Sequence, residues 1–186
     1  MSGTWKTIFV IATCALAVGA GNPAAAATMQ QLSMSDMALQ STAIVRARVV
    51  SSSASFTGST IYTHYKLQVS ETWKGTTPVE VMVPGGVAGG YRQSFPGAPQ
   101  LQSGSDYVLF LWTSKAGITH IIGLTQGLFN IATQADGSSM ANRGASGETM
   151  LDAKGKQVED RGVQVGLTAL KAQVAQYLGN TAGALK

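Results

Sequence analysis

The sequence predicts an all-β domain, a small OB-like barrel or sandwich of five to six strands, with a short helix before it and an amphipathic helix after it. Apolar and polar residues alternate through 43–51 and 61–73, which is the period of half-buried strands. Residues 107–112 (YVLFLW) are apolar on both faces and indicate a central strand. Leucine and valine recur at helical spacings of three and four residues within 167–178.

The first 27 residues have the pattern of a secretory signal peptide. Lys6 precedes an apolar stretch, 7–20 (TIFVIATCALAVGA), and the small residues 24–27 form the expected cleavage site. The apolar stretch is shorter than the roughly 20 residues that span a bilayer. We therefore expect cleavage after Ala27, export to the periplasm or the extracellular space, and no transmembrane span in the remaining chain.

The only cysteine, Cys14, lies inside the predicted signal peptide. A lipoprotein with Cys14 as its first residue is the alternative, but Thr13 is a poor residue immediately before a lipidated cysteine. Cleavage after Ala27 removes the thiol, which excludes disulfides and a cysteine nucleophile. Removing 27 of 186 residues leaves 159, the size of one domain.

The remaining chain divides into four predicted parts. Residues 28–42 form an N-terminal helical segment with Ser33 or Ser35 as its N-cap. Residues 43–143 form the β domain, with strands expected at 43–51, 61–73, 79–83, 107–112, 119–124 and 127–132. Residues 144–165 are a polar excursion, either mobile or a small hairpin. Residues 166–186 are the C-terminal helix and tail.

The candidate binding surface is the glycine-rich stretch that follows the third predicted strand. Glycine pairs permit positive φ angles and close backbone approach, and a connection this long points to a functional or packing role. The first interpretation is a glycine-built corner of the barrel. The second is an aromatic and guanidinium surface for a protein or glycan partner. Its candidate residues are Gly85, Gly86, Gly89, Gly90, Tyr91, Arg92, Phe95 and Pro99, together with Gln126.

The residues that carry chemistry are dispersed. His64 and His120 are the only histidines and have no metal-ligand spacing, so we expect no metal and no cofactor. The serines lack a nucleophile motif such as G-x-S-x-G, and the glycine pairs match neither a dinucleotide fingerprint nor a P-loop. Glu71 is interpreted as a strand-end salt bridge. Lysine and arginine form no cluster, which excludes a nucleic-acid footprint.

The order of the motifs resembles a known family. Residues 44–50 (IVRARVV), 69–75 (VSETWKG), 83–86 (VPGG), 97–99 (GAP) and 124–129 (LTQGLF) are similar to those of a family of exported, functionally uncharacterised bacterial proteins. More weakly, the chain is similar to the netrin-like barrel of tissue inhibitors of metalloproteinases. That similarity implies an OB-type fold and a protease-inhibitor role, although the cysteines of that family are absent here.

These observations favour an exported, non-catalytic binding domain whose partner is an exported protein, such as a protease or an envelope component, or a glycan. Two alternatives remain. One is an inhibitor or partner of a secreted protease, which the netrin-like similarity implies. The other is a hydrolase that uses a serine and His64. The aromatic residues Tyr107, Phe110, Trp112, Phe129 and Trp73 are predicted to lie in the core.

Overall fold

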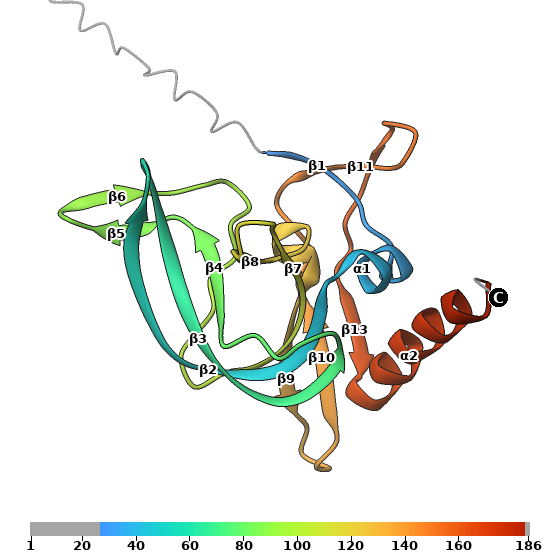
Figure 1. The fold of residues 1–186 in the computed structure, drawn as a ribbon. Helices are drawn as coiled ribbons and strands as arrows, with labels where there is room; N and C mark the ends of the chain where they lie inside the picture. The colour runs from blue at the N-terminus through green and yellow to red at the C-terminus, as the bar shows by residue number, and fades with distance from the viewer. Residues whose placement is uncertain (1–26, 185–186) are drawn as a thin grey trace, which may run out of the picture.

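The computed structural model describes residues 27–184, and strands make up most of its regular structure (Figure 1). It confirms the predicted all-β class with one short helix near the start and a longer helix at the end. The predicted signal sequence, apart from Ala27, lies outside the described residues. Within residues 27–184, no helix combines the length and the apolar character needed to cross a membrane.

The largest sheet has eight strands, in the order β13-β10-β9-β7-β2-β3-β4 with β8 beside the end of β7. The sequence predicted only five to six strands. The difference arises because short strands such as β13 leave little periodic pattern in the sequence. The strands are β2 (Ala43–Thr57), β3 (Thr60–Lys74), β4 (Glu80–Pro84), β7 (Asp106–Thr113), β8 (Thr119–Ile121), β9 (Leu128–Thr133), β10 (Ser139–Arg143) and β13 (Val163–Gly166).

The long hairpin of β2 and β3 curls the sheet over on itself (Figure 1). The pairing register of these strands shifts at three places between Ile44 and Ser51, and such bulges bend a strand. The sheet does not close into a barrel. Strands β4 and β8 approach each other but are not paired through their backbones. At this place His120 Nδ1 donates a hydrogen bond to the Met82 carbonyl oxygen at 3.0 Å. Of the two predicted architectures, the open sheet agrees with the sandwich.

Two hydrophobic cores lie on opposite faces of β2 and β7. One face points into the curled sheet and includes Val45, Val49, Val81, Leu109 and Leu111. The other face lies under the helices and includes Ile44, Val108, Phe110, Phe129, Leu170 and Val174. Because both faces of β7 are buried, its sequence has no polar alternation, which confirms the prediction of a central strand.

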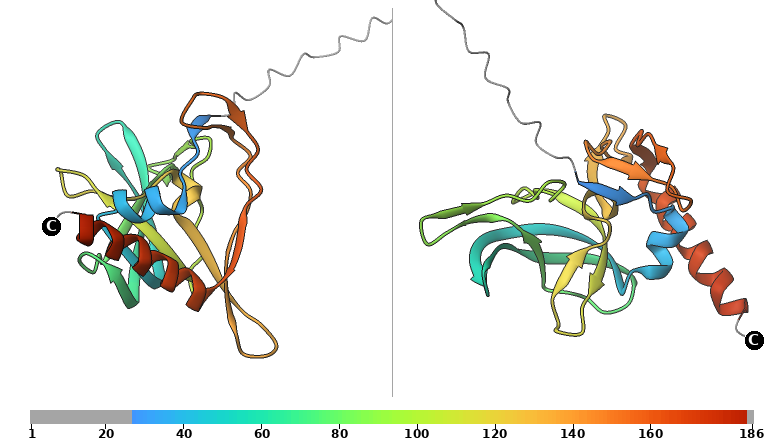
Figure 2. Two further views of the ribbon diagram at one scale, coloured as in Figure 1. Left: turned by 90° about the vertical axis from the view of Figure 1, so that its right-hand side faces the viewer. Right: turned by 90° about the horizontal axis from the view of Figure 1, so that it is seen from above.

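The two helices α1 (Met34–Gln40) and α2 (Leu167–Ala184) lie together on one side of the sheet (Figure 2). Ser33 is the N-cap of α1 and forms a capping box with Asp36. Lys74 Nζ donates to the carbonyl oxygens of Ala38 and Leu39, both at 2.8 Å, and so satisfies the C-terminal end of α1. Helix α2 continues beyond Leu178, where the sequence predicted its end.

The polar excursion forms a small hairpin, one of its two predicted forms. Strand β11 (Thr149–Leu151) pairs with β12 (Gln157–Val158) and lies parallel to β1 (Thr28–Gln30). The remaining elements are the 3-10 helix η1 (Leu124–Gly127) and the strands β5 (Gly86–Ala88) and β6 (Tyr91–Gln93). The N-terminal segment is therefore tied to the chain that precedes α2.

Trp112 is the exception among the aromatic residues predicted to lie in the core. Phe110 and Phe129 are fully buried and Tyr107 is 4% exposed, but Trp112 is 46% exposed. Trp112 follows Phe110 on the same face of β7, at the end of the strand, and is not part of the core under α1 and α2. Its ring stacks instead on His120, with centroids 6.4 Å apart.

Candidate functional site

The glycine-rich stretch folds into a hairpin of its own. Strands β5 and β6 form a separate two-stranded sheet beside the tip of the β2–β3 hairpin (Figure 1). The turn between them is Gly89-Gly90, with φ angles of 56° and 79°. A two-residue turn with both φ angles positive matches the twist of a hairpin and strongly favours glycine.

The base of this hairpin packs closely against β2 and β3. At Gly86, whose φ is 135°, a Cβ atom would lie 2.6 Å from Thr63 Oγ1 and 3.1 Å from Ala54 Cβ. Gly85 precedes it, and its carbonyl oxygen accepts a hydrogen bond from Thr63 Oγ1 at 2.8 Å. Gly85 and Gly86 therefore lie where the hairpin packs closely on β2 and β3.

Gln93, which the sequence prediction missed, fixes the hairpin in place. Its side-chain oxygen accepts from the Ile61 backbone nitrogen at 2.6 Å, and its side-chain nitrogen donates to the Ser59 carbonyl oxygen at 3.0 Å. The sequence feature that could have pointed to Gln93 is its position at the end of a short strand, opposite Gly86. Its partners, about 30 residues earlier, could not be identified from local sequence.

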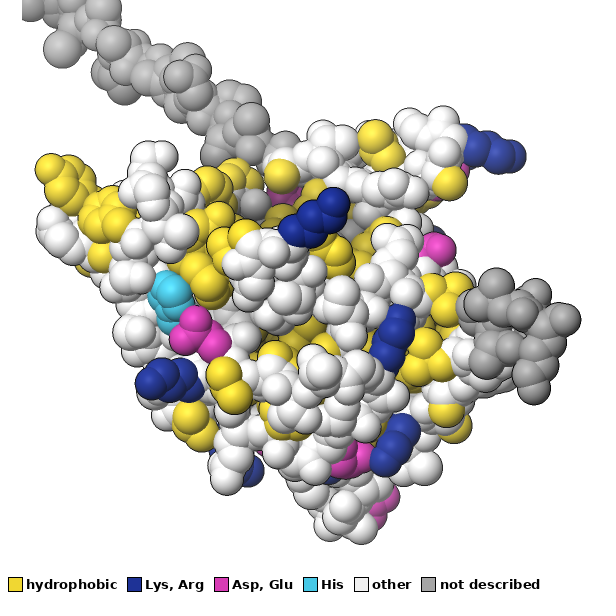
Figure 3. All heavy atoms as spheres, viewed as in Figure 1, with side chains coloured by type: hydrophobic (Ala, Val, Ile, Leu, Met, Phe, Trp, Pro, Cys, Tyr) yellow, Lys and Arg dark blue, Asp and Glu magenta, His cyan; other side chains and the backbone are white. Residues whose placement is uncertain are grey.

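The outer end of the hairpin exposes large apolar side chains. We call this surface the aromatic tip; it consists of Phe56 (47% exposed), Val87 (51%), Tyr91 (69%) and Phe95 (41%). The rings of Phe56 and Tyr91 meet edge to face with centroids 6.2 Å apart. Hydrophobic side chains gather at the corresponding end of the molecule (Figure 3). Phe56, on the neighbouring hairpin, was not among the predicted site residues.

A cavity of about 170 Å³ lies behind the tip. The structure brings five of the nine predicted residues to its walls: Gly85, Gly86, Arg92, Phe95 and Pro99. Gly89, Gly90 and Tyr91 lie on the outer turn. Arg92 is exposed and forms no ion pair with any described residue. Residues 84–105 contain no acidic residue, and Arg92 is their only charged residue.

Gln126 does not belong to this surface. It is 3% exposed and lies in η1. Its side-chain oxygen accepts from the Leu32 backbone nitrogen at 2.8 Å, and its side-chain nitrogen donates to the Gln30 carbonyl oxygen at 3.0 Å. Both ends of the amide therefore hold the N-terminal segment and not the glycine-rich stretch.

A serine, a histidine and a glutamate line up across β2, β3 and β4. His64 Nδ1 lies 2.8 Å from Glu80 Oε1, and His64 Nε2 lies 2.9 Å from Ser55 Oγ. In the tautomer with its proton on Nδ1, the ring donates to Glu80, and Nε2 accepts from the serine hydroxyl. This is the hydrogen-bond order of a Ser-His-acid triad. The sequence prediction singled out His64 but neither Ser55 nor Glu80.

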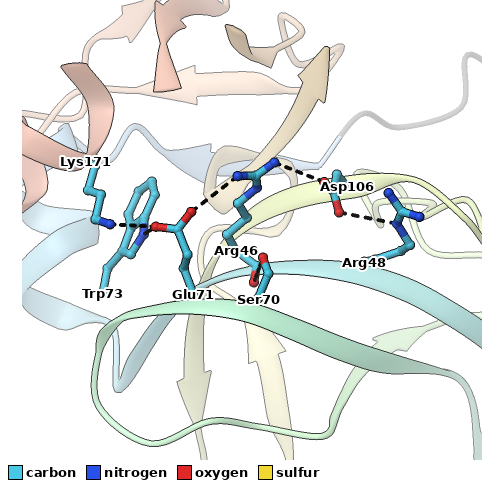
Figure 4. A network of polar contacts seen from close by, with 7 residues as sticks. All are labelled: Arg46, Arg48, Ser70, Glu71, Trp73, Asp106 and Lys171. Atoms are coloured by element: carbon cyan, nitrogen blue, oxygen red, sulfur yellow. Dashed lines mark hydrogen bonds and ion pairs between the residues drawn. The ribbon is translucent and has the colours of Figure 1, made fainter. Parts of the chain in front are cut away.

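A chain of charges joins α2 to the sheet (Figure 4). Lys171 Nζ lies 2.6 Å from Glu71 Oε2, and Arg46 contacts Glu71 and Asp106, both at 3.3 Å. Hydrogen bonds from Lys171 first, then from Trp73, lower the pKa of Glu71. The predicted salt bridge at Glu71 is confirmed, with Lys171 and Arg46 as its partners.

No protein-family model matches the chain, and no curated protein matches it. Within the described part of the chain, no group of three or more histidine, aspartate or glutamate side chains could hold a metal ion. The candidate sites are therefore the aromatic tip with Arg92 and the cluster of Ser55, His64 and Glu80.

Proposed function

We propose that this protein is an exported, non-catalytic binding domain and that the aromatic tip with Arg92 contacts a protein partner. The observation that carries the proposal is the exposure of four large apolar side chains where the hairpin of β5 and β6, which Gln93 bonds to β3 and its preceding turn, meets the end of β2. Exposed apolar patches mark interaction surfaces. Tyrosine and arginine are the residue types that most often dominate the binding energy of an interface.

The shape and charge of the tip favour a protein over a small ligand. The tip projects outward, so the partner must supply the concave surface. Because Arg92 is unpaired and residues 84–105 contain no acidic residue, a carboxylate next to an apolar pocket is the chemistry we expect on the partner. A secreted protease is the partner class that the netrin-like resemblance implies.

Replacement of both Tyr91 and Arg92 by alanine should abolish partner capture. The full chain and the double variant are immobilised and exposed to the exported fraction of the native organism. A partner found by mass spectrometry is then purified and titrated against both. Loss of two dominant contacts should weaken Kd about 1,000-fold, since the loss of each typically costs about 2 kcal/mol or more and about 1.4 kcal/mol changes Kd tenfold.

The matched control replaces Val79 and Lys115, an exposed apolar residue and a basic residue outside the tip. This variant should bind like the unmodified chain. Equal binding by the tip variant would contradict the proposal. Loss of a captured protease's activity in a one-to-one complex would assign the inhibitor role.

A second candidate function is ester or amide hydrolysis by Ser55, favoured by the hydrogen-bond order of the cluster. Glu80 would hold the His64 ring with Nδ1 protonated, and Nε2 would take the proton of Ser55 Oγ as this oxygen attacks a carbonyl carbon. The protonated ring would return the proton to the leaving group, and water would release the acyl group from Ser55. The cluster lies on the outer face of the sheet, where a large substrate can reach it.

A fluorophosphonate probe and p-nitrophenyl acetate test this candidate directly. If Ser55 is a nucleophile, the probe labels it, and Ser55→Ala or His64→Ala lowers hydrolysis by about 10³-fold or more. Ser53→Ala is the control, because Ser53 pairs with His64 across the strands but does not hydrogen-bond to it. An unlabelled protein, or hydrolysis unchanged in Ser55→Ala, would exclude the activity. Partner binding through the tip should survive His64→Ala.

A further inference from the structure

A second cavity, of about 330 Å³, lies apart from the aromatic tip and from the Ser55 cluster. Three of its lining residues, Tyr107, Asn130 and Asn142, follow one another in register across β7, β9 and β10. Residues paired across neighbouring strands share a face of the sheet. The pairing therefore places two carboxamides beside a tyrosine ring that is 4% exposed.

The segment before β7 adds two more carboxamides to this cavity. Leu101 is buried in the core, while Gln100 and Gln102 on either side of it are exposed and line the cavity. The Gln102 backbone nitrogen donates to the Tyr107 hydroxyl oxygen at 2.9 Å, which fixes this segment against β7. The side chains of Gln100, Gln102 and Asn130 form no hydrogen bond with the described residues.

Two buried polar atoms of the cavity lining also lack partners within residues 27–184. They are Thr125 Oγ1 and Arg143 Nε. Buried polar atoms in folded proteins nearly always have a hydrogen-bond partner. The Arg143 side chain is only 10% exposed. The cavity thus combines free carboxamides with two neighbouring polar groups whose hydrogen-bonding capacity is not satisfied within the described chain.

The net charge of the cavity lining indicates which class of ligand it can bind. Arg143 is the only charged residue in its lining, and both of its terminal nitrogens are bonded to Asp160, at 2.7 and 2.8 Å. The site is therefore nearly neutral and does not favour an anion. A carboxamide donates and accepts hydrogen bonds at once, as a hydroxyl group does. The half-buried Leu128 supplies apolar surface beside these groups.

We propose that this cavity binds a neutral saccharide. Vicinal hydroxyl groups match the paired carboxamides, and the C–H face of a sugar ring fits the apolar side. The volume suits one or two sugar rings, since ligand sites begin at about 300 Å³. The site contains none of the four side chains of the aromatic tip and not Arg92, although Gln100 also lines the cavity behind the tip.

Saturation-transfer NMR on the full chain tests this binding. The probes are glucose, galactose, mannose, N-acetylglucosamine and their disaccharides at about 10 mM, with glucuronic acid and glucosamine as charged counterparts. At least one neutral sugar should bind, and Asn130→Ala should weaken its Kd about tenfold by removing one pair of hydrogen bonds. Gln134→Ala, an exposed carboxamide outside the cavity, should leave binding unchanged. The double replacement of Tyr91 and Arg92 should also leave it unchanged.

Three results would overturn the proposal. The first is the absence of any transfer to neutral sugars in a folded sample. The second is equal or stronger binding of a charged sugar, because the site would then recognise charge. The third is binding that Asn130→Ala and Gln102→Ala leave unaltered, because the sugar would then lie elsewhere on the protein.

Discussion

Asp160→Asn should lower the free energy of unfolding by about 3 kcal/mol at pH 7, because it leaves the buried guanidinium of Arg143 without a charged partner. The Asp160 side chain is 3% exposed and that of Arg143 10%. The carboxylate also accepts from the backbone nitrogens of Ser146 at 2.8 Å and Gly162 at 3.1 Å. One side chain thus fixes the chain on both sides of the hairpin of β11 and β12.

The same carboxylate predicts how stability depends on pH. Hydrogen bonds from Arg143, followed by those from the backbone, lower the pKa of Asp160 from 3.8 to about 2. A carboxylate whose pKa is depressed in the folded protein contributes its stabilisation fully above the unfolded pKa. It loses that stabilisation as the pH falls through the folded pKa. Asp160 should therefore stabilise the protein by an amount on the order of 2 kcal/mol above pH 4, and this should disappear toward pH 2.

Urea denaturation followed by tryptophan fluorescence, at several pH values, measures both effects. The neighbouring Glu159→Gln is the matched control: Glu159 is 74% exposed and pairs with an exposed Arg161. Its replacement should change stability by less than about 0.5 kcal/mol. If Asp160→Asn cost no more than Glu159→Gln, or if their difference persisted at pH 2, the assigned role of Asp160 would be wrong.

Gly75→Ala should destabilise the protein by about 3 kcal/mol or more. Gly75 has a φ of 69°, and a Cβ atom there would overlap the Thr42 carbonyl oxygen. Thr42 cannot easily move, because its backbone nitrogen donates to the Leu111 carbonyl oxygen at 2.8 Å and its hydroxyl accepts from the Thr113 backbone nitrogen at 2.9 Å. The cost therefore combines left-handed backbone strain of about 1–2 kcal/mol with a backbone overlap.

Gly58→Ala separates these two contributions. Gly58 has a similar φ of 62°, but a Cβ atom there meets no heavy atom within 4 Å. We expect it to cost about 1 kcal/mol, from backbone strain alone. Thermal or urea unfolding of both variants provides the comparison. Equal costs would show that Thr42 yields without penalty and that close packing at Gly75 contributes nothing.

The local sequence was sufficient to predict the class of the fold and most of its elements. Alternation in 43–51 and 61–73 predicted strands, and the two-faced apolar run 107–112 predicted the strand that lies between two cores. Ser33 predicted the start of α1. Tyr91 and Phe95 are exposed, as expected for side chains on the glycine-rich connection, whereas Phe56 and Val87 of the tip were not predicted. Each of these signals lies within a few residues of the feature that it predicts.

The tertiary structure alone decided which distant residues meet. The order of strands in the sheet brings Lys171 to Glu71, Gln126 to the N-terminal segment, and Gln93 to Ile61. Register and curl place Ser55 and Glu80 on either side of His64, and gather the carboxamides of four separate positions around one cavity. The position of Trp112 depends on where the helices stop covering β7. Periodicity specifies which face of a strand is buried. The residue that a side chain contacts there can lie up to 100 residues away in the sequence, as Lys171 does from Glu71. No local pattern encodes such contacts.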